Sequence, residues 1–96
     1  MVEKLSDAQR EQALRGLGDW IYDPSSGAIS RVFKFRDFSE AFAFMARVAL
    51  AAEKAGHHPD WSNSYNSVTI NLSTHDAGGL SDKDIALAGV IDRLLV

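Results

Sequence analysis

Apolar residues recur at helical spacing through the middle of the chain. Between residues 37 and 55 they follow the i, i+3, i+4, i+7 spacing of an amphipathic helix, in a stripe made of Phe38, Ala41, Phe42, Met45, Val48, Ala49 and Ala52. Asp37 stands where a helix cap is expected, with Glu40 at the third position of a capping box, and Gly56 is a stop signal. The pattern predicts a helix over residues 37–55 that buries this stripe, Phe42 included.

Two other stretches alternate between apolar and polar residues, which is the pattern of a half-buried strand. Residues 28–36 place Ile29, Arg31, Phe33 and Phe35 on one mostly apolar face, and residues 67–74 do the same with Val68, Ile70 and Leu72. Residues 19–22 and 61–66 are predicted as their antiparallel partners, joined to them by turns at 23–27 and near Asn66. His75 is expected to continue the polar face of the last strand.

Capping signals mark a helix at each end of the chain. Ser6 and Gln9 have capping-box spacing and predict a short helix over about residues 7–15 that ends at Gly16. Ser81 caps a last helix, whose core-facing residues are expected to be Ile85, Ala88, Ile91 and Leu95. The resulting order is α-β-β-α-β-β-α. We predict one α+β domain over residues 1–96, with a four-stranded antiparallel sheet and helices packed on one face.

Composition narrows the classes of function. The formal charge is −3 and the basic residues are scattered, which argues against direct nucleic-acid binding. The chain has no cysteine, so disulfides and thiolate chemistry are excluded and a cytoplasmic location is expected. It also has no run of 18 apolar residues, and we expect no membrane span.

All three histidines fall in two short runs, residues 56–61 and 73–76, where regular elements are predicted to end. Imidazole titrates near neutral pH, which suits proton transfer. Pro59 restricts His58 to extended geometry, so the side chains of His57 and His58 diverge and take different roles. We expect His75 to meet them in one cleft, with Glu53 orienting an imidazole.

Other interpretations of these residues stay open at this point. The histidines are also compatible with solvated loop positions, and with Asp76 and Glu53 they could bind zinc, although their spacing matches no established zinc pattern. Ser62 and Ser73 lack the local signature of a nucleophile. Acid–base chemistry by histidine is the interpretation that uses all three imidazoles.

The same residues carry a resemblance to a known family. Residues 53–61, Tyr65-Asn66, residues 73–80 and Asp84 together resemble the pterin-4a-carbinolamine dehydratases. The most specific part is His-His-Pro-x-Trp followed by Thr-His-Asp-x-x-Gly-Leu, and the similarity extends back through residues 31–35 and 38–48. The chain differs from some members of the family at two positions: Gly56 stands where they carry an acidic residue, and Lys83 where they carry arginine.

The resemblance implies a lyase that dehydrates 4a-hydroxytetrahydropterin to quinonoid dihydropterin and so recycles tetrahydrobiopterin, without cofactor or metal. It implies that His57, His58 and His75 are the active-site histidines, and our own hypothesis assigns proton transfer to His57 and His75 and orientation of the pterin chiefly to His58. Residues implied to bind the substrate are Pro59, Trp61, Ser73, Thr74 and Asp76, with Glu53 and Lys83 in support. Trp61 is expected to pack beneath the site and not to stack on the pterin ring. It also implies a homodimer or homotetramer and a functional link to phenylalanine hydroxylase.

Two other functions are compatible with the resemblance. Some relatives act as dimerisation cofactors of a transcription factor, which needs no catalysis. Other members of the family are expected to bind a pterin of molybdopterin metabolism, because the cleft would recognise the pterin head that these compounds share.

Overall fold

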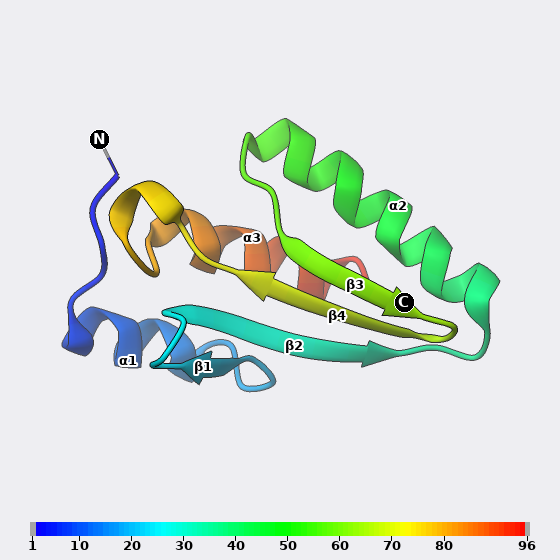
Figure 1. The fold of residues 1–96 in the computed structure, drawn as a ribbon, viewed down its shortest axis with the longest axis horizontal. Coiled ribbons are helices and arrows are strands. Elements are labelled where there is room, and N and C mark those ends of the chain that lie inside the picture. The colour runs from blue at the N-terminus through cyan, green and yellow to red at the C-terminus, as the bar shows by residue number, and fades with distance from the viewer. Residues whose placement is uncertain (1, 96) are drawn as a thin grey trace.

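The computed structural model describes residues 2–95 and confirms the predicted order of helices and strands (Figure 1). The elements are α1 (Asp7–Arg15), β1 (Ile21–Asp23), β2 (Ala28–Lys34), α2 (Phe38–Ala55), β3 (Asp60–Ser64), β4 (Ser67–Leu72), the 3-10 turn η1 (His75–Ala77) and α3 (Asp82–Arg93). The strands form one antiparallel sheet in the order β1-β2-β4-β3. None of the helices within residues 2–95 combines the length and the apolar character needed to cross a membrane.

The register of the sheet gathers its apolar residues on one face. Directly opposed residues on antiparallel strands project to the same side. Ile29 of β2 pairs with Leu72 of β4, and Phe33 pairs with Val68. On the other side of β4, Ile70 pairs with Trp61. The predicted alternation of both long strands is therefore confirmed, and its apolar side forms the floor of the core.

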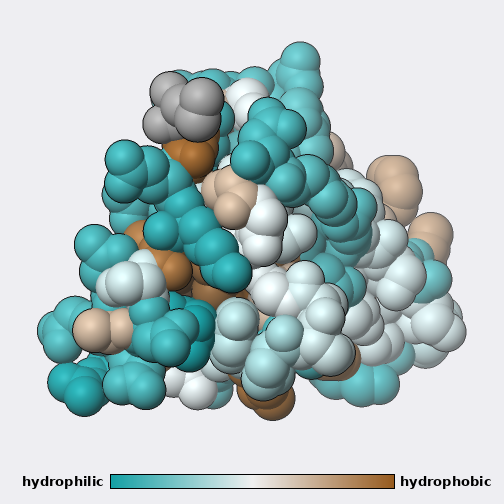
Figure 2. Space-filling view, turned by 60° about the vertical axis from the view of Figure 1, so that its left-hand side comes forward, coloured by the Kyte–Doolittle hydropathy of each residue, from teal (hydrophilic) through white to brown (hydrophobic). Residues whose placement is uncertain are grey.

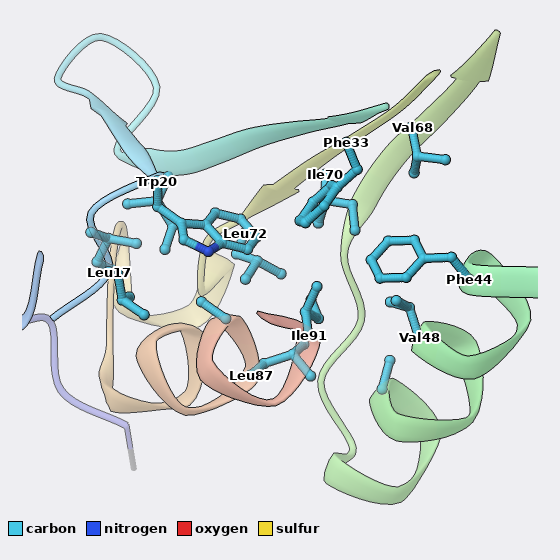
Figure 3. Packing of buried hydrophobic residues seen from close by; sticks show 14 of the residues in the cluster. Leu17, Trp20, Phe33, Phe44, Val48, Val68, Ile70, Leu72, Leu87 and Ile91 are labelled. Atoms are coloured by element: carbon cyan, nitrogen blue, oxygen red, sulfur yellow. The ribbon is translucent and has the colours of Figure 1, made fainter. Parts of the chain in front are cut away.

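Helices α2 and α3 cover this apolar face (Figures 1 and 3). Figure 3 shows Phe44 and Val48 of α2 directed toward the sheet beside Phe33 and Ile70. The Phe44 ring lies 4.9 Å from that of Phe33 and 5.0 Å from that of Phe35. From α3, Leu87 and Ile91 fill the space below Leu72. Helix α1 has no buried residue and lies at the end of the sheet.

The buried stripe of α2 differs from the one that its spacing predicts. The buried residues are Ala41, Phe44, Val48 and Ala52, whereas Phe42 is 55% and Phe38 is 48% exposed and Ala49 is exposed. Apolar residues surround most of this helix, so two stripes have helical spacing. Phe44 is the buried aromatic because only its stripe places a ring against Phe33 and Phe35. The prediction that Phe42 is a core residue was wrong.

The caps agree with the prediction except at one helix. Ser6 with Gln9 and Ser81 with Asp84 form complete capping boxes. At α2, Asp37 accepts from the Glu40 backbone N–H at 2.9 Å, but the Glu40 side chain accepts from the Arg36 N–H and not from Asp37. Half of the predicted capping box is therefore present at this helix.

The last strand ends earlier than predicted, which changes the setting of His75. Strand β4 stops at Leu72, and His75 opens the turn η1 and does not continue the strand. Thr74 and Gly79 exchange two backbone hydrogen bonds, of 2.9 and 3.3 Å, that close residues 74–79 into a loop. The reason is local: a closed loop satisfies these backbone groups without an adjacent strand.

Candidate active site

The two histidine runs line one cleft of about 420 Å³ at the end of the molecule where α2 and β4 finish. Figure 1 shows the end of α2, the turn η1 and the N-terminal segment gathered at this end. The lining residues are Val2, Gly56, His57, His58, Pro59, Asp60, Ser73, Thr74, His75, Asp76 and Lys83. Figure 2 turns this end toward the viewer, and its surface is mainly hydrophilic, with hydrophobic colour confined to small areas.

Local structure explains why two distant runs meet. Gly56 ends α2 with a φ of 64°, a left-handed conformation that glycine adopts without a Cβ penalty. The chain then turns through residues 57–59 into β3, where Asp60 pairs with Asn71 of β4. The first residues of β3 and the last residues of β4 therefore lie side by side, and each leads directly into one of the histidine runs.

His57 is bound to a fully buried carboxylate. Its Nε2 atom lies 2.6 Å from Oδ1 of Asp84, and the imidazole is only 11% exposed. The other oxygen, Oδ2, accepts from the Thr74 hydroxyl at 2.8 Å and from the Ser81 backbone N–H at 3.0 Å. Asp84 is held by partners from three segments of the chain, so the imidazole that it binds is fixed in place.

The hydroxyls around Asp84 form an ordered chain. Because Thr74 uses its hydroxyl proton on Asp84, the 2.6 Å contact between the two hydroxyls makes Ser81 the donor to Thr74. The Ser81 oxygen in turn accepts from the Lys83 N–H at 3.2 Å. Within residues 2–95, no buried side-chain nitrogen or oxygen lacks a hydrogen-bond partner. This network is complete, and complete polar networks keep their members in one arrangement.

The bond to Asp84 also assigns the tautomer of His57. A carboxylate only accepts hydrogen bonds, so Nε2 of His57 carries the proton. In the neutral imidazole, Nδ1 is then the atom with the free lone pair. Nδ1 is therefore the ring nitrogen of His57 that is available to accept a hydrogen bond or a proton from a ligand.

The two other histidines also lie beside carboxylates, but near the surface. His58 Nε2 lies 2.9 Å from Glu53 Oε1, and its side chain is 64% exposed. His75 Nε2 lies 3.7 Å from Asp60 Oδ2 and is 84% exposed. Each of the three imidazoles that line the cleft thus has a carboxylate partner, and the three pairs differ in burial. No group of three or more potential ligands within the described residues is arranged to hold a metal ion.

Most of the predicted site residues line the cleft. Those that do are His57, His58, Pro59, Ser73, Thr74, His75, Asp76 and Lys83. Glu53 lies outside the lining, with its Oε1 atom 2.9 Å from Nε2 of His58. Trp61 lies outside the lining and packs against the core, which gives no support to a direct contact with substrate. The Thr74 hydroxyl is committed to Asp84 and Ser81, so it positions Asp84 and is not free to bind a ligand.

Three residues of the site were not predicted as such: Asp84, Asp60 and Val2. Asp84 is the third residue of α3 and reaches back to the Ser81 N–H as part of a capping box. That signal is visible in the sequence, but the same carboxylate also binds His57, which lies 27 residues earlier. Asp60 follows the His-His-Pro run directly, and only the fold brings it near His75.

Similar proteins identify the family of this chain. Residues 3–94 match the family described as pterin 4 alpha carbinolamine dehydratase. The chain belongs to this family. A protein of Rhizorhabdus wittichii that carries the name pterin-4-alpha-carbinolamine dehydratase is 59% identical over 93 residues. The match covers 97% of this chain and 96% of that protein. One from Rhodospirillum rubrum is 56% identical over 95 residues and covers 99% of each chain.

Two solved structures have the same fold. The crystal structure of a transcriptional coactivator/pterin dehydratase from Brucella melitensis matches with a TM-score of 0.92 at 43% identity, covering 96% of this chain and 98% of that one. A pterin dehydratase-like protein described as a RuBisCO assembly factor in the alpha-carboxysome matches with a TM-score of 0.68. Its 23% identity supports similarity of fold alone.

Proposed function

We propose that this member of the pterin dehydratase family is a hydro-lyase that converts 4a-hydroxytetrahydropterin to quinonoid dihydropterin and water. The observation that carries the proposal is the set of three imidazole–carboxylate pairs at one cleft. The reaction breaks the C4a–O bond, removes the proton from N5 and forms the C4a=N5 double bond. It needs an acid at the departing hydroxyl and a base at N5, and positioned imidazoles serve both purposes.

The geometry supports a different role for each histidine. His57 is the base for the N5 proton, because Asp84 occupies its Nε2 and leaves the Nδ1 lone pair free. His75 is the acid that protonates the leaving hydroxyl, since it stands on the opposite run beside Asp60 and is open to the cleft. His58, held by Glu53, orients the pterin.

The remaining polar groups of the cleft suit the polar edge of a pterin, which presents an amide and an amino group. Ser73 and Asp76 lie on the run that carries His75, and Lys83 lies on the first turn of α3. We assign substrate binding to these side chains and to the ring of Pro59. Thr74 belongs to the support of Asp84.

Stopped-flow dehydration of 4a-hydroxytetrahydropterin tests the proposal. The wild-type protein should accelerate the loss of substrate over buffer. His57→Ala and His75→Ala should each lower kcat by roughly 10²–10⁴-fold. The stability of His75→Ala should match the wild type because its side chain is exposed. A folded wild-type protein with no acceleration would refute dehydratase activity.

We further propose that the chain assembles with copies of itself. Strand β1 pairs with β2 only as far as Ser30, so among the described residues the backbone of β2 from residue 31 to 34 has no partner on that side. An unpaired edge of this kind favours pairing with another strand. Helix α2 in addition exposes Phe42 and Leu50, at 55% and 74%.

These two surfaces predict different assemblies. Pairing of the β2 edge about a twofold axis gives a homodimer, and burial of the α2 face between two such dimers gives a homotetramer. Size-exclusion chromatography with light scattering measures the mass. Leu50→Lys should halve the mass of a tetramer and leave a dimer intact. A monomeric wild type would refute self-assembly.

A second function is favoured by the name of the Brucella melitensis relative, which pairs transcriptional coactivator with pterin dehydratase. In such a role the exposed face of α2 would bind a helix of a partner protein. His75→Ala separates the two functions, because it should lower the rate of dehydration and leave binding of a partner protein unchanged. The links to phenylalanine hydroxylase and to molybdopterin metabolism stay predictions.

A further inference from the structure

The N-terminal segment lies along the loop that follows His75. The Leu5 backbone N–H donates to the Leu80 carbonyl at 2.8 Å, and the Leu5 side chain packs against the core. Helix α1 begins directly afterwards at the capping box of Ser6. We call residues 2–5 the N-terminal strap. Figure 1 shows it leading away from α1 and running beside η1.

The strap covers the loop closely. Gly79 is buried, and a Cβ atom at this position would stand 3.1 Å from Cε and 3.5 Å from Cδ of Lys4. The aliphatic part of Lys4 therefore rests on the Gly79 backbone, and a side chain at residue 79 would push the lysine aside. With Leu5 bound to Leu80 and Lys4 seated on Gly79, the strap leads residue 2 to the cleft.

Val2 places an apolar isopropyl group in a cleft whose other side chains are mostly polar. It is half-buried and lines the cleft together with the histidines and Lys83. Among the lining residues that the structure describes, the apolar side chains are Val2 and the ring of Pro59, and Val2 is the one that the N-terminal strap supplies. A polar edge of a ligand gains nothing from this contact, whereas an apolar substituent loses contact with water and is stabilised.

We propose that Val2 determines which substituent at C6 of the pterin the cleft prefers. This inference rests on the proposed function. The pyrimidine edge of a pterin is polar, and the variable substituent is attached at C6, next to N5. The group that takes the N5 proton therefore stands close to the C6 substituent. Val2, which shares the cleft with His57 and His75, is the wall that an apolar C6 group contacts.

The test compares two substrates and two substitutions in the full chain. The substrates are 4a-hydroxytetrahydropterins with a methyl group or only hydrogen at C6. Val2→Gly removes the apolar contact, and Val2→Thr keeps the shape of the side chain but replaces one methyl group by a hydroxyl. Tyr65→Gly is the matched control, because it removes an exposed side chain at the turn between β3 and β4, at the opposite end of that hairpin, and its φ of 50° suits glycine.

For the wild type, kcat/KM should be higher for the 6-methyl substrate. Val2→Gly should reduce this preference about 10-fold by raising KM for the 6-methyl substrate, while kcat for both substrates stays within about twofold of wild type. Val2→Thr should lose part of the preference, and Tyr65→Gly none. An unchanged preference in Val2→Gly, or an equal loss for both substrates, would overturn the assignment.

Failure of the proposed function would look different. If the wild type dehydrates neither substrate, fluorescence titration with 7,8-dihydropterin and its 6-methyl derivative replaces the kinetic readout. A preference for the methyl derivative that disappears in Val2→Gly supports the role of Val2 even then. Absence of binding, or a preference that Val2→Gly retains, overturns it.

Discussion

Replacing Asp84 by asparagine changes one group of the site without changing its shape. Thr74 and Ser81 both donate to Oδ2 of this buried side chain. The amide oxygen of asparagine must face them, because an amino group there would leave a buried N–H without an acceptor, at a cost of about 1–3 kcal/mol. The amide NH₂ then faces Nε2 of His57, which has to give up its proton and move to the other tautomer.

The size of the effect follows from two losses. Removing the charge-assisted bond to Nε2 disfavours the active tautomer by about 2–3 kcal/mol, which corresponds to roughly 30–150-fold in its population. The imidazolium that forms when the base accepts a proton also loses its carboxylate partner. Together we expect kcat to fall by roughly 10³-fold, within the range of a lost general base. The free energy of unfolding should fall by about 1–3 kcal/mol, because the hydrogen bond to His57 is weakened while those from Thr74 and Ser81 are kept.

Two measurements on the same variant test this account. Stopped-flow dehydration gives kcat, and ¹⁵N NMR of the ring nitrogens reports which nitrogen of His57 carries the proton. The spectrum is simple because the chain has three histidines. Asp82→Asn is the control: it makes the same change of charge on the first turn of α3, but its side chain is exposed. That control should retain the wild-type rate and tautomer.

The reasoning would be refuted by a variant in which NMR shows the proton on Nδ1 of His57 while kcat stays within about threefold of wild type. Such a result would exclude Nδ1 of His57 as the base. A 10³-fold loss with the tautomer unchanged would refute the proposed cause and require that Asp84 acts on the charge of the imidazolium alone.

Three further predictions concern stability. In urea unfolding, Phe44→Ala should lower the free energy of unfolding by about 3–5 kcal/mol and Phe42→Ala by less than about 1 kcal/mol, and equal costs would contradict the observed stripe. Trp20→Phe should cost about 1–3 kcal/mol, because its indole N–H donates to a carboxylate of α3 at 3.0 Å, and a neutral effect would exclude this bond as a support. The Glu40 backbone N–H donates to the Asp37 carboxylate and holds its pKa below the usual 3.8. The ionised carboxylate therefore stabilises the fold above about pH 3.8, and this contribution is lost as the pH falls through the lowered pKa of Asp37. Asp37→Asn should flatten this acid loss in thermal melts recorded from neutral pH downward, and an unchanged slope would refute the assignment.

Local signals in the sequence determined which elements form and where the helices begin. A capping box spans four residues and strand alternation needs only neighbours, so Ser6, Ser81, Gly56 and the β4 pattern could be interpreted without knowledge of the fold. The spacing of the His-His-Pro-x-Trp and Thr-His-Asp runs likewise identified both walls of the cleft, because the residue types carry the chemistry themselves.

Tertiary structure decided which of several locally equivalent choices is realised. Phe42 and Phe44 both belong to stripes with helical spacing, and only contact with Phe33 and Phe35 selects Phe44. Asp84 satisfies its own helix cap in any fold, and packing of α3 beside the end of α2 is what makes it the partner of His57. Capping and alternation depend on bonds within a few residues, whereas burial and pairing depend on which distant surfaces exclude water together.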